Sequence, residues 1–300
     1  MSPEYWADKE EQTNELIKGV SNEITSFESV VAKKYIELIT DKLTTKGKII
    51  IDSGTYSDIE KINSEVYDLM IKSDIPKRLK GIIDIIENEI ELSSEFVEVV
   101  SGAKAKAVNI SNEKKLFIKN MSDQIIGYES FKIKLISKYN DVLFNGIMQN
   151  ASIGELRDSI LNLSKKTVSK GSSLSIYAGQ IATDTINQYR GFVQSKIAEN
   201  GRFNAWGYFG SLVEKSRPQC IRWVTDFNGV IPFSKLKEEV KWANKNGTGY
   251  GDIVLTEKNF PTIRGGHNCR HNVIAIVQND KAEKYLNSLR RVINSRASQT

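Results

Sequence analysis

The chain has 300 residues, of which 40% are hydrophobic and 26% are charged. This balance is typical of a folded soluble protein and excludes a chain that is disordered throughout. No apolar run approaches the roughly 20 residues that a membrane-spanning helix needs. The first 15 residues are polar and acidic and do not contain the apolar core of a secretory signal. We therefore expect no membrane segment and synthesis in a cytoplasm.

The net charge of +5 is unevenly distributed along the chain. Residues 201–300 contain 16 Lys and Arg against 8 Asp and Glu, a net charge of +8, whereas residues 1–200 carry −3. A basic C-terminal part is typical of contact with nucleic acid or an acidic protein surface, although solvated surface lysines would give the same count. Only two cysteines occur, Cys220 and Cys269, which excludes a disulfide-rich secreted scaffold.

Hydrophobic residues at helical spacing predict a mostly helical region over residues 1–170. No proline lies between Pro76 and Pro218, so nothing there prevents long helices. Capping boxes and proline mark several of the expected helix starts. The expected elements are a helix at 24–43, a strand at 48–52, a helix after the box Ser57–Glu60, a helix opened by Pro76, a helix at 113–145 and a helix after the box Ser152–Glu155.

A long helix is expected at Ser173–Glu199, because apolar residues continue at helical spacing after a break at Lys170–Ser173. Gly201 is well placed to end this helix. Composition changes at the same point, since nine of the 20 glycines and three of the four tryptophans follow residue 200. The sequence therefore predicts a helical region at 1–170, a connecting helix at 171–200 and a small basic domain at 201–300.

The last hundred residues have the composition of a small mixed α/β domain with a short sheet. An aromatic strand is expected first, and Asn228-Gly229 is a turn signal typical of hairpins. We expect the tryptophans to form the core of this domain rather than to stack on bases. The fold class is thus α+β, with an elongated, mostly helical N-terminal region before the small domain. Its expected elements are a strand at 203–212, a helical turn at 217–223, a helix at 234–244, a glycine-rich loop at 246–251, a strand at 272–277 and a helix at 281–293.

The most distinctive segment is Arg264–His271, which reads RGGHNCRH and leads into the last strand. Both histidines of the chain flank Cys269 at alternate positions, so in an extended segment His267, Cys269 and His271 would share one face. With Cys220 they would form a ligand set that tetrahedral Zn²⁺ accepts. His-x-Cys-x-His is not a usual zinc-finger spacing, however. A disulfide between the two cysteines, or simple packing of two thiols, therefore stays open beside the metal site.

Several motifs follow one another in order over residues 173–277. They are Ile181–Asn187 on the long helix, then Trp206, then Ser216–Cys220 with Pro218, then Asn228-Gly229-Val-Ile, and last a loop from Pro261 through Gly265 and Gly266 to Asn268-Cys269-Arg270-His271. This order and spacing resembles the C-terminal domain of the phage Mu F-like minor head proteins, a phage head morphogenesis family. The chain departs from that family in having a single Cys220 where a Cys-x-x-Cys pair is common, and no histidine shortly after the Arg-rich turn.

The resemblance implies a structural virion protein that acts in head morphogenesis, at the portal or in the inner capsid, and is not an enzyme. It implies that residues 1–170 contact the portal or capsid protein. The basic module would also contact packaged double-stranded DNA without sequence specificity, through Arg217, Arg222, Arg264 and Arg270. The protein would be made in the host cytoplasm and end up in the virion. No cofactor is required, with Zn²⁺ as the only candidate.

The alternative function is a phage-borne nuclease or toxin-like effector that uses the C-terminal domain. His267 and His271 would then be the general acid–base pair, and Arg264 and Arg270 would bind the scissile phosphate. Carboxylates are scarce nearby, and the same residues would equally well pin a glycine-rich loop to a strand. We therefore expect a structural role and assign no catalytic residue.

Overall fold

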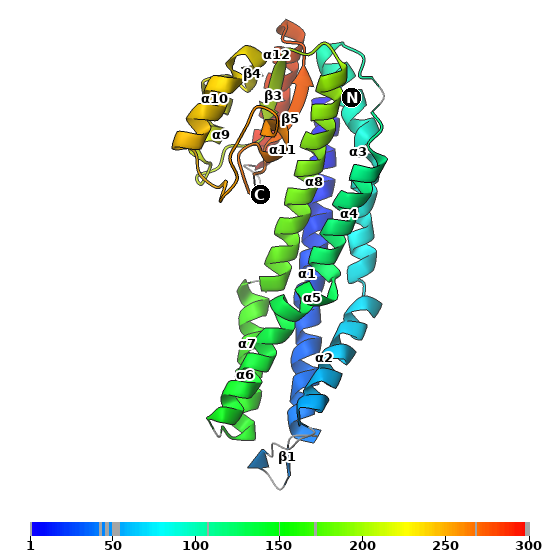
Figure 1. Cartoon of the computed structure of the whole chain (residues 1–300), viewed down its shortest axis with the longest axis vertical. Coiled ribbons are helices and arrows are strands. Elements are labelled where there is room, and N and C mark those ends of the chain that lie inside the picture. Colours follow the sequence, from blue (N-terminus) through cyan, green and yellow to red (C-terminus); the bar gives the residue numbers. More distant parts are fainter. Residues whose placement is uncertain are drawn as a thin grey trace. The chain divides into compact units, whose positions relative to one another are not determined.

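The computed structural model describes residues 2–41, 44–45, 48–49, 55–106, 108–149, 151–170, 173–267 and 269–297. The chain is mostly helical, and a three-stranded antiparallel sheet lies near its C-terminus (Figure 1). The predicted α+β class is therefore confirmed. Within these ranges, every helix is too short or too polar to cross a membrane.

The chain forms two compact units, each built from segments that are far apart in the sequence. The first comprises residues 1–14, 83–118 and 183–300, and the second comprises residues 15–82 and 119–182. These units differ from the ranges 1–170, 171–200 and 201–300 expected from the sequence, because long helices pass from one unit into the other. The helices that contribute to both are α1 (Pro3–Asp41), α3 (Ile75–Ser101), α4 (Ser111–Ile126) and α8 (Ser173–Asn200).

In its described residues, the second unit is helical apart from one short strand pair. At its centre the buried Tyr35 hydroxyl lies 2.6 Å from Asn63 Oδ1 and 2.7 Å from Asn140 Oδ1, so one polar network joins three helices. Its own elements are the strands β1 (Thr44–Thr45) and β2 (Lys48–Ile49), the helices α2 (Thr55–Lys72), α5 (Tyr128–Phe131), α6 (Ser137–Met148) and α7 (Ile153–Lys170), and the π-helical turn η1 (Lys132–Ile136).

Local sequence signals locate some helix ends in this unit and miss others. Ser152 and Glu155 form the expected capping box, with their backbone N–H groups donating to each other's side chains at 2.7 and 3.3 Å. The prediction that the box Ser57–Glu60 caps the start of a helix is wrong, because α2 already begins at Thr55. The helix expected at 113–145 is interrupted at Gly127, whose backbone is extended. Residues 42–43 and 50–52 of the expected elements lie outside the described residues.

The sheet of the first unit has the order β4–β3–β5, with β3 (Ala205–Phe209) in the centre. Antiparallel pairing sets Gly207 opposite Val230 of β4 (Val230–Pro232) and Ile274 of β5 (Asn272–Ile276). Every residue of β3 and β5 is buried. The sheet is surrounded by α9 (Pro218–Thr225), α10 (Phe233–Asn246), α11 (Phe260–Ile263) and α12 (Asp280–Ala297).

Aromatic side chains form the core of this unit. Trp223 is fully buried and makes edge contacts with Tyr208 and Phe260, and Trp206 packs on Phe233. The tryptophans at 206 and 223 therefore serve as core residues, as predicted. The N-terminus also contributes, since Trp6 of α1 stacks on Phe96 of α3 at 4.1 Å and lies edge-on to Phe209 of β3. This core accordingly draws on all three sequence segments of the unit.

One buried ion cluster joins the same three segments. Arg190 of α8 donates from Nε to Glu89 Oε2 at 2.8 Å, and its NH1 donates to Glu10 of α1. Glu89 also accepts a hydrogen bond from Ser93 at 2.9 Å. Burial raises the pKa of the Glu89 carboxyl, and the Arg190 charge opposes that shift. Removing the arginine alone would leave a carboxylate in the core without its cation.

The free energy of unfolding of the variant Arg190→Met should therefore be lower than that of the wild type by about 3–5 kcal/mol. All four tryptophans lie in the first unit, so urea unfolding followed by tryptophan fluorescence reports on this unit. Burial raises the pKa of Glu89, so the folded variant takes up a proton on this carboxylate at a higher pH than the unfolded chain does. The loss of stability caused by Arg190→Met should therefore become smaller as the pH is lowered.

The matched control is Lys196→Met, which removes an exposed ion pair with Glu199 from the same helix. This variant should differ from the wild type by less than about 1 kcal/mol. Equal effects of the two substitutions would show that the buried cluster does not stabilise the unit.

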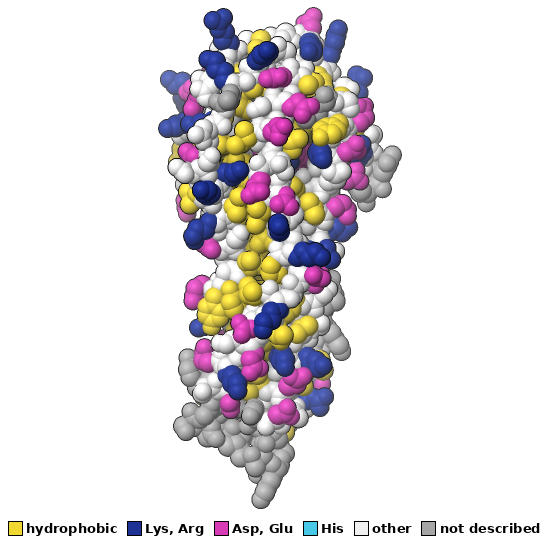
Figure 2. All heavy atoms as spheres, turned by 90° about the vertical axis from the view of Figure 1, so that its right-hand side faces the viewer, with side chains coloured by type: hydrophobic (Ala, Val, Ile, Leu, Met, Phe, Trp, Pro, Cys, Tyr) yellow, Lys and Arg dark blue, Asp and Glu magenta, His cyan; other side chains and the backbone are white. Residues whose placement is uncertain are grey.

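Figure 2 shows one face of the molecule. Acidic and basic side chains are intermixed there, with hydrophobic side chains between them, and no area of a single charge stands out. This face therefore does not offer the continuous basic surface that a nucleic acid would follow.

Candidate functional site

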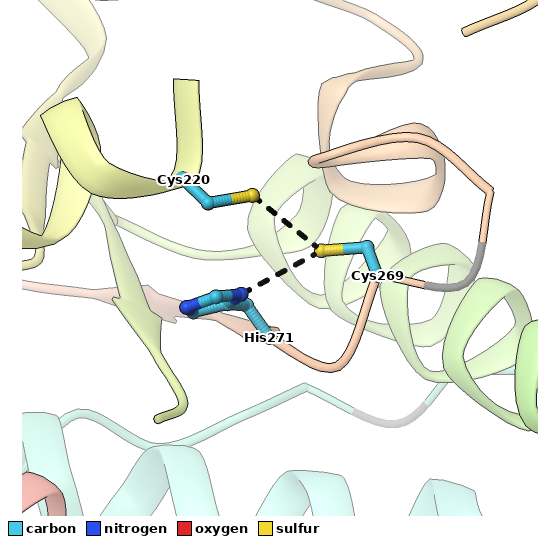
Figure 3. A group of neighbouring side chains, drawn as sticks. All are labelled: Cys220, Cys269 and His271. Atoms are coloured by element: carbon cyan, nitrogen blue, oxygen red, sulfur yellow. Dashed lines mark hydrogen bonds between the residues drawn. The ribbon is translucent and has the colours of Figure 1, made fainter. Parts of the chain in front are cut away.

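Cys220, Cys269 and His271 come together in the interior of the first unit (Figure 3). The two sulfurs are 4.0 Å apart, and Cys269 Sγ is 3.7 Å from His271 Nδ1. All three side chains are buried, with exposed fractions of 3–4%. In Figure 3 the side chains of Cys220 and His271 both point toward the Cys269 sulfur. Three of the four predicted ligands thus form one group.

Each member of this Cys–His group is placed by a different local structure. Cys220 lies in the first turn of α9, which begins at Pro218, a residue well suited to a helix start. Cys269 follows a turn in which its N–H donates to the Gly266 carbonyl at 3.2 Å. His271 precedes β5, and the pairing of Phe209 with Asn272 holds it beside the end of the central strand.

Tyr208 of β3 belongs to the same group, although the sequence analysis did not single it out. Its hydroxyl lies 3.2 Å from Cys220 Sγ and 3.5 Å from Cys269 Sγ, and its ring stacks on His271 with centroids 4.9 Å apart. The residue is fully buried. Its position in an aromatic strand was a sequence signal for burial but gave no indication of contact with the cysteines.

Glycine is required where the loop before β5 passes the cysteines. A Cβ at Gly265 would lie 2.4 Å from Cys220 Sγ and 2.7 Å from Cys269 Sγ. The next residue, Gly266, has φ +91°, a conformation that side-chain-bearing residues rarely adopt. The Gly265 carbonyl accepts hydrogen bonds from Arg217 NH1 at 2.5 Å and from Gln219 Nε2 at 3.1 Å. Two side chains at the start of α9 therefore clamp the loop.

The loop is also fixed to helix α8. A Cβ at Gly191 would lie 2.0 Å from the Pro261 carbonyl oxygen, so only glycine allows α11 to approach this closely. Asn187, one turn earlier, donates from Nδ2 to the Cys269 carbonyl at 3.2 Å and accepts at its own carbonyl from Arg264. Asn187 and Gly191 of α8 thus hold the segment from Pro261 to Cys269 against the helix.

The two thiols are in hydrogen-bond contact and shift each other's pKa. The hydrogen bond from Cys220 lowers the pKa of the Cys269 thiol well below its usual range, and His271 and Arg264 act in the same direction. The same hydrogen bond, together with burial, raises the pKa of Cys220. Burial likewise raises the pKa of the Tyr208 phenol. Of the two cysteines, Cys269 is thus the one whose surroundings favour the thiolate, the form of cysteine that binds metals.

The geometry of the group fits a tetrahedral metal. Zn–S distances of about 2.3 Å and Zn–N distances of about 2.0–2.1 Å place neighbouring ligand atoms about 3.6–3.8 Å apart. Two of the three observed separations, 4.0 Å and 3.7 Å, are close to these values, and all three ligand atoms lie within 4.8 Å of one another. Two sulfurs and one imidazole nitrogen are also the donors that Zn²⁺ prefers. The cysteines do not form a disulfide in this structure, because both are free.

His267 does not join the group. It is exposed, whereas Cys269 and His271 are buried. The expectation of one shared face assumed an extended segment, but Gly266 has φ +91° and its carbonyl accepts a turn hydrogen bond from the Cys269 N–H. Asn268, expected as a motif residue, lies outside the described residues.

Most of the arginines expected to contact nucleic acid are engaged inside the protein. Arg264 is 1% exposed, so it cannot reach a duplex. Arg217 clamps the loop through carbonyl groups. Arg222 forms two hydrogen bonds of 2.8 Å with Glu239 and lies over the Trp242 ring. Arg270, in contrast, is exposed.

The remaining motif residues have structural positions. Trp206 lies in the central strand, and Pro218 is the first residue of α9. Gly229 has φ +67°, and a Cβ there would lie 2.5 Å from the Tyr208 carbonyl oxygen. The Asn228-Gly229 turn therefore brings β4 directly beside the central strand.

Comparison with models of protein families, with curated proteins and with solved structures finds no match to this chain. The function must accordingly be argued from the residues and their geometry.

Gly265→Ala should destabilise the first unit by about 1–3 kcal/mol, the usual cost of an added methyl group in a filled core. Because the new methyl group forces the sulfurs apart, both cysteines should also react faster with a thiol reagent. Thermal unfolding by circular dichroism and timed thiol labelling measure the two effects.

Gly154→Ala is the matched control, because only Ser152 Oγ, at 3.9 Å, lies near its added Cβ. This variant should be as stable as the wild type or slightly more so, with unchanged thiol reactivity. A Gly265→Ala protein with native stability and unreactive thiols would contradict the close packing.

Proposed function

We propose that the chain is a structural protein of phage head morphogenesis that acts at the portal or inner capsid, of the Mu F-like type. The observation that carries the proposal is the convergence of its motifs. Segments spread over a hundred residues meet at one three-stranded sheet and one buried Cys–His group.

The convergence can be followed motif by motif. Trp206 lies in the central strand, and the segment that ends at Cys220 begins α9. Asn228-Gly229 leads into β4, and the loop that contains Cys269 leads into β5. The helix with Asn187 holds that loop by its carbonyl group. The described motif residues from Asn187 onward therefore all lie in the first unit.

Within this module, Cys220, Cys269 and His271 would hold a Zn²⁺ ion. The ion would cross-link α9 to the loop before β5, a structural contribution that a small sheet with short strands can use. The buried position of the group supports a structural role, since catalytic zinc sites keep a position open to substrate.

The geometry favours this function over a nuclease. A general acid–base pair must reach the substrate from both sides, but His271 is buried while His267 is exposed. Arg264, expected to bind the phosphate, is also buried. The residues proposed for catalysis therefore do not form a site that an RNA or DNA phosphate can enter.

Contact with packaged DNA would be non-specific and would depend on the net charge of residues 201–300 and on Arg270. Arg217, Arg222 and Arg264 already have carboxylate or carbonyl partners inside the protein. The portal or capsid protein is for this reason the main partner in the proposal.

The purified full-length chain should contain about one Zn²⁺ per molecule by mass spectrometry of the metal. His271→Ala and Cys269→Ser should lose it, because each removes one of the buried ligands. His267→Ala is the control and should retain the metal, since this side chain is exposed. If His267→Ala lost zinc as completely as His271→Ala, the proposed ligand set would be wrong.

The virion assignment is tested on particles. Heads purified from cells that produce the phage should contain the chain at a fixed, low copy number relative to the major capsid protein, by quantitative mass spectrometry. Deleting its gene should reduce infectious particles while leaving the major capsid protein at normal levels. A chain that is absent from particles and degrades RNA in cell extracts would instead favour the effector alternative.

A further inference from the structure

We propose that Tyr208 is the fourth ligand of the metal centre, so that the site is a closed Cys₂-His-Tyr tetrahedron. This assignment rests on the zinc site proposed above and adds a residue type that is not among the usual structural zinc ligands, which are cysteine and histidine.

The need for a fourth donor follows from the burial of the site. Structural zinc ions have four ligands, and a centre with three protein ligands completes its shell with water or substrate. Among the described residues, the group of His, Cys, Asp and Glu side chains has only three members, Cys220, Cys269 and His271. All three are buried, and so is the surrounding loop at Gly265. Burial of the site favours a donor from the protein core in the fourth position.

The Tyr208 hydroxyl occupies this position. Its oxygen is 3.2 Å from Cys220 Sγ and 3.5 Å from Cys269 Sγ, and the sulfurs are 4.0 Å apart. A point roughly 0.8 Å out of the plane of these three atoms, where a tetrahedral centre would lie, is about 2.2 Å from each of them, close to the metal–ligand distances of zinc sites. His271 Nδ1, 3.7 Å from Cys269 Sγ, supplies the remaining corner.

The side chain of Tyr208 is held in this orientation from both sides. Its ring stacks on His271 at an interplanar angle of 15° and meets Trp223 edge-on at 5.2 Å. The residue belongs to the central strand, which is paired on both edges. A Cβ at Gly265 would lie 3.2 Å from its hydroxyl, so the loop also approaches the oxygen closely. The donor is thus preorganised by the fold.

Coordination converts the phenol into a phenolate, and the proton leaves to solvent or buffer. The experiment loads the full-length protein with Zn²⁺ at neutral pH and measures protons released per ion, together with the near-ultraviolet difference spectrum. In the wild type we expect a phenolate absorption band. In Tyr208→Phe we expect no band, one fewer proton released per Zn²⁺ and an affinity reduced by more than about 100-fold, beyond the effect of an outer-shell partner.

Tyr250→Phe is the matched control. Tyr250 is also buried, but its hydroxyl donates to the Arg264 carbonyl at 3.0 Å. This variant should release as many protons as the wild type and keep the band. If Tyr208→Phe does not fold, the presence or absence of the phenolate band in the wild type tests the assignment. The band can be attributed to Tyr208 because its hydroxyl contacts both sulfurs.

The outcomes separate the two proposals. One Zn²⁺ per chain without a phenolate band, and with equal proton release from Tyr208→Phe, overturns the fourth-ligand assignment alone and makes Tyr208 a hydrogen-bond donor to a thiolate. A chain that binds no Zn²⁺ overturns the metal centre and this assignment together. Neither result bears on whether the chain is present in phage particles.

Discussion

The close passage of the loop at Gly265 beside the two cysteine sulfurs is the contact on which the arrangement around the Cys–His group depends. A methyl group there would lie within 2.4 Å of Cys220 Sγ, so the loop can occupy this place only as glycine. The loop position then sets where Cys269 and His271 lie and where β5 begins its pairing with β3. The stacking of His271 on Tyr208 follows from that register. One close approach thus links the position of β5 to the arrangement of the Cys–His group.

The sheet is supported by segments from the start and the middle of the chain. Trp6 and Phe96 pack on Phe209 of the central strand, and Arg190 joins Glu10 to Glu89 in the same unit. Residues 201–300 therefore do not enclose their own core, although their composition and charge differ from the rest of the chain. The change in composition near residue 200 marks where the kind of secondary structure changes. It does not mark the edge of a compact unit, which depends on which residues share buried contacts.

Local signals in the sequence predicted local structure well. The Ser152–Glu155 box, the helix start at Pro218 and the buried tryptophans depend on residues near one another or on hydrophobicity alone. The sequence pattern also predicted that Cys220, Cys269 and His271 lie close together, and the structure places them in one group. The pattern failed for His267, because Gly266 at φ +91° turns a segment that was expected to be extended. It missed Tyr208, because its place beside the sulfurs depends on strand pairing and on an α9 packing that no short pattern encodes.

The burial of the Cys–His group decides what kind of chemistry it can perform. A Cys269 thiolate beside an imidazole would be a reactive nucleophile if a substrate could reach it. Here both side chains are buried, and Arg217, Gln219 and Asn187 hold the loop closed over them through its carbonyl groups. The same features suit an ion that must be retained, because dissociation would require the clamps to open. Metal affinity in such a site is linked to folding, so a small sheet can be stabilised by binding energy that its own hydrophobic contacts do not supply.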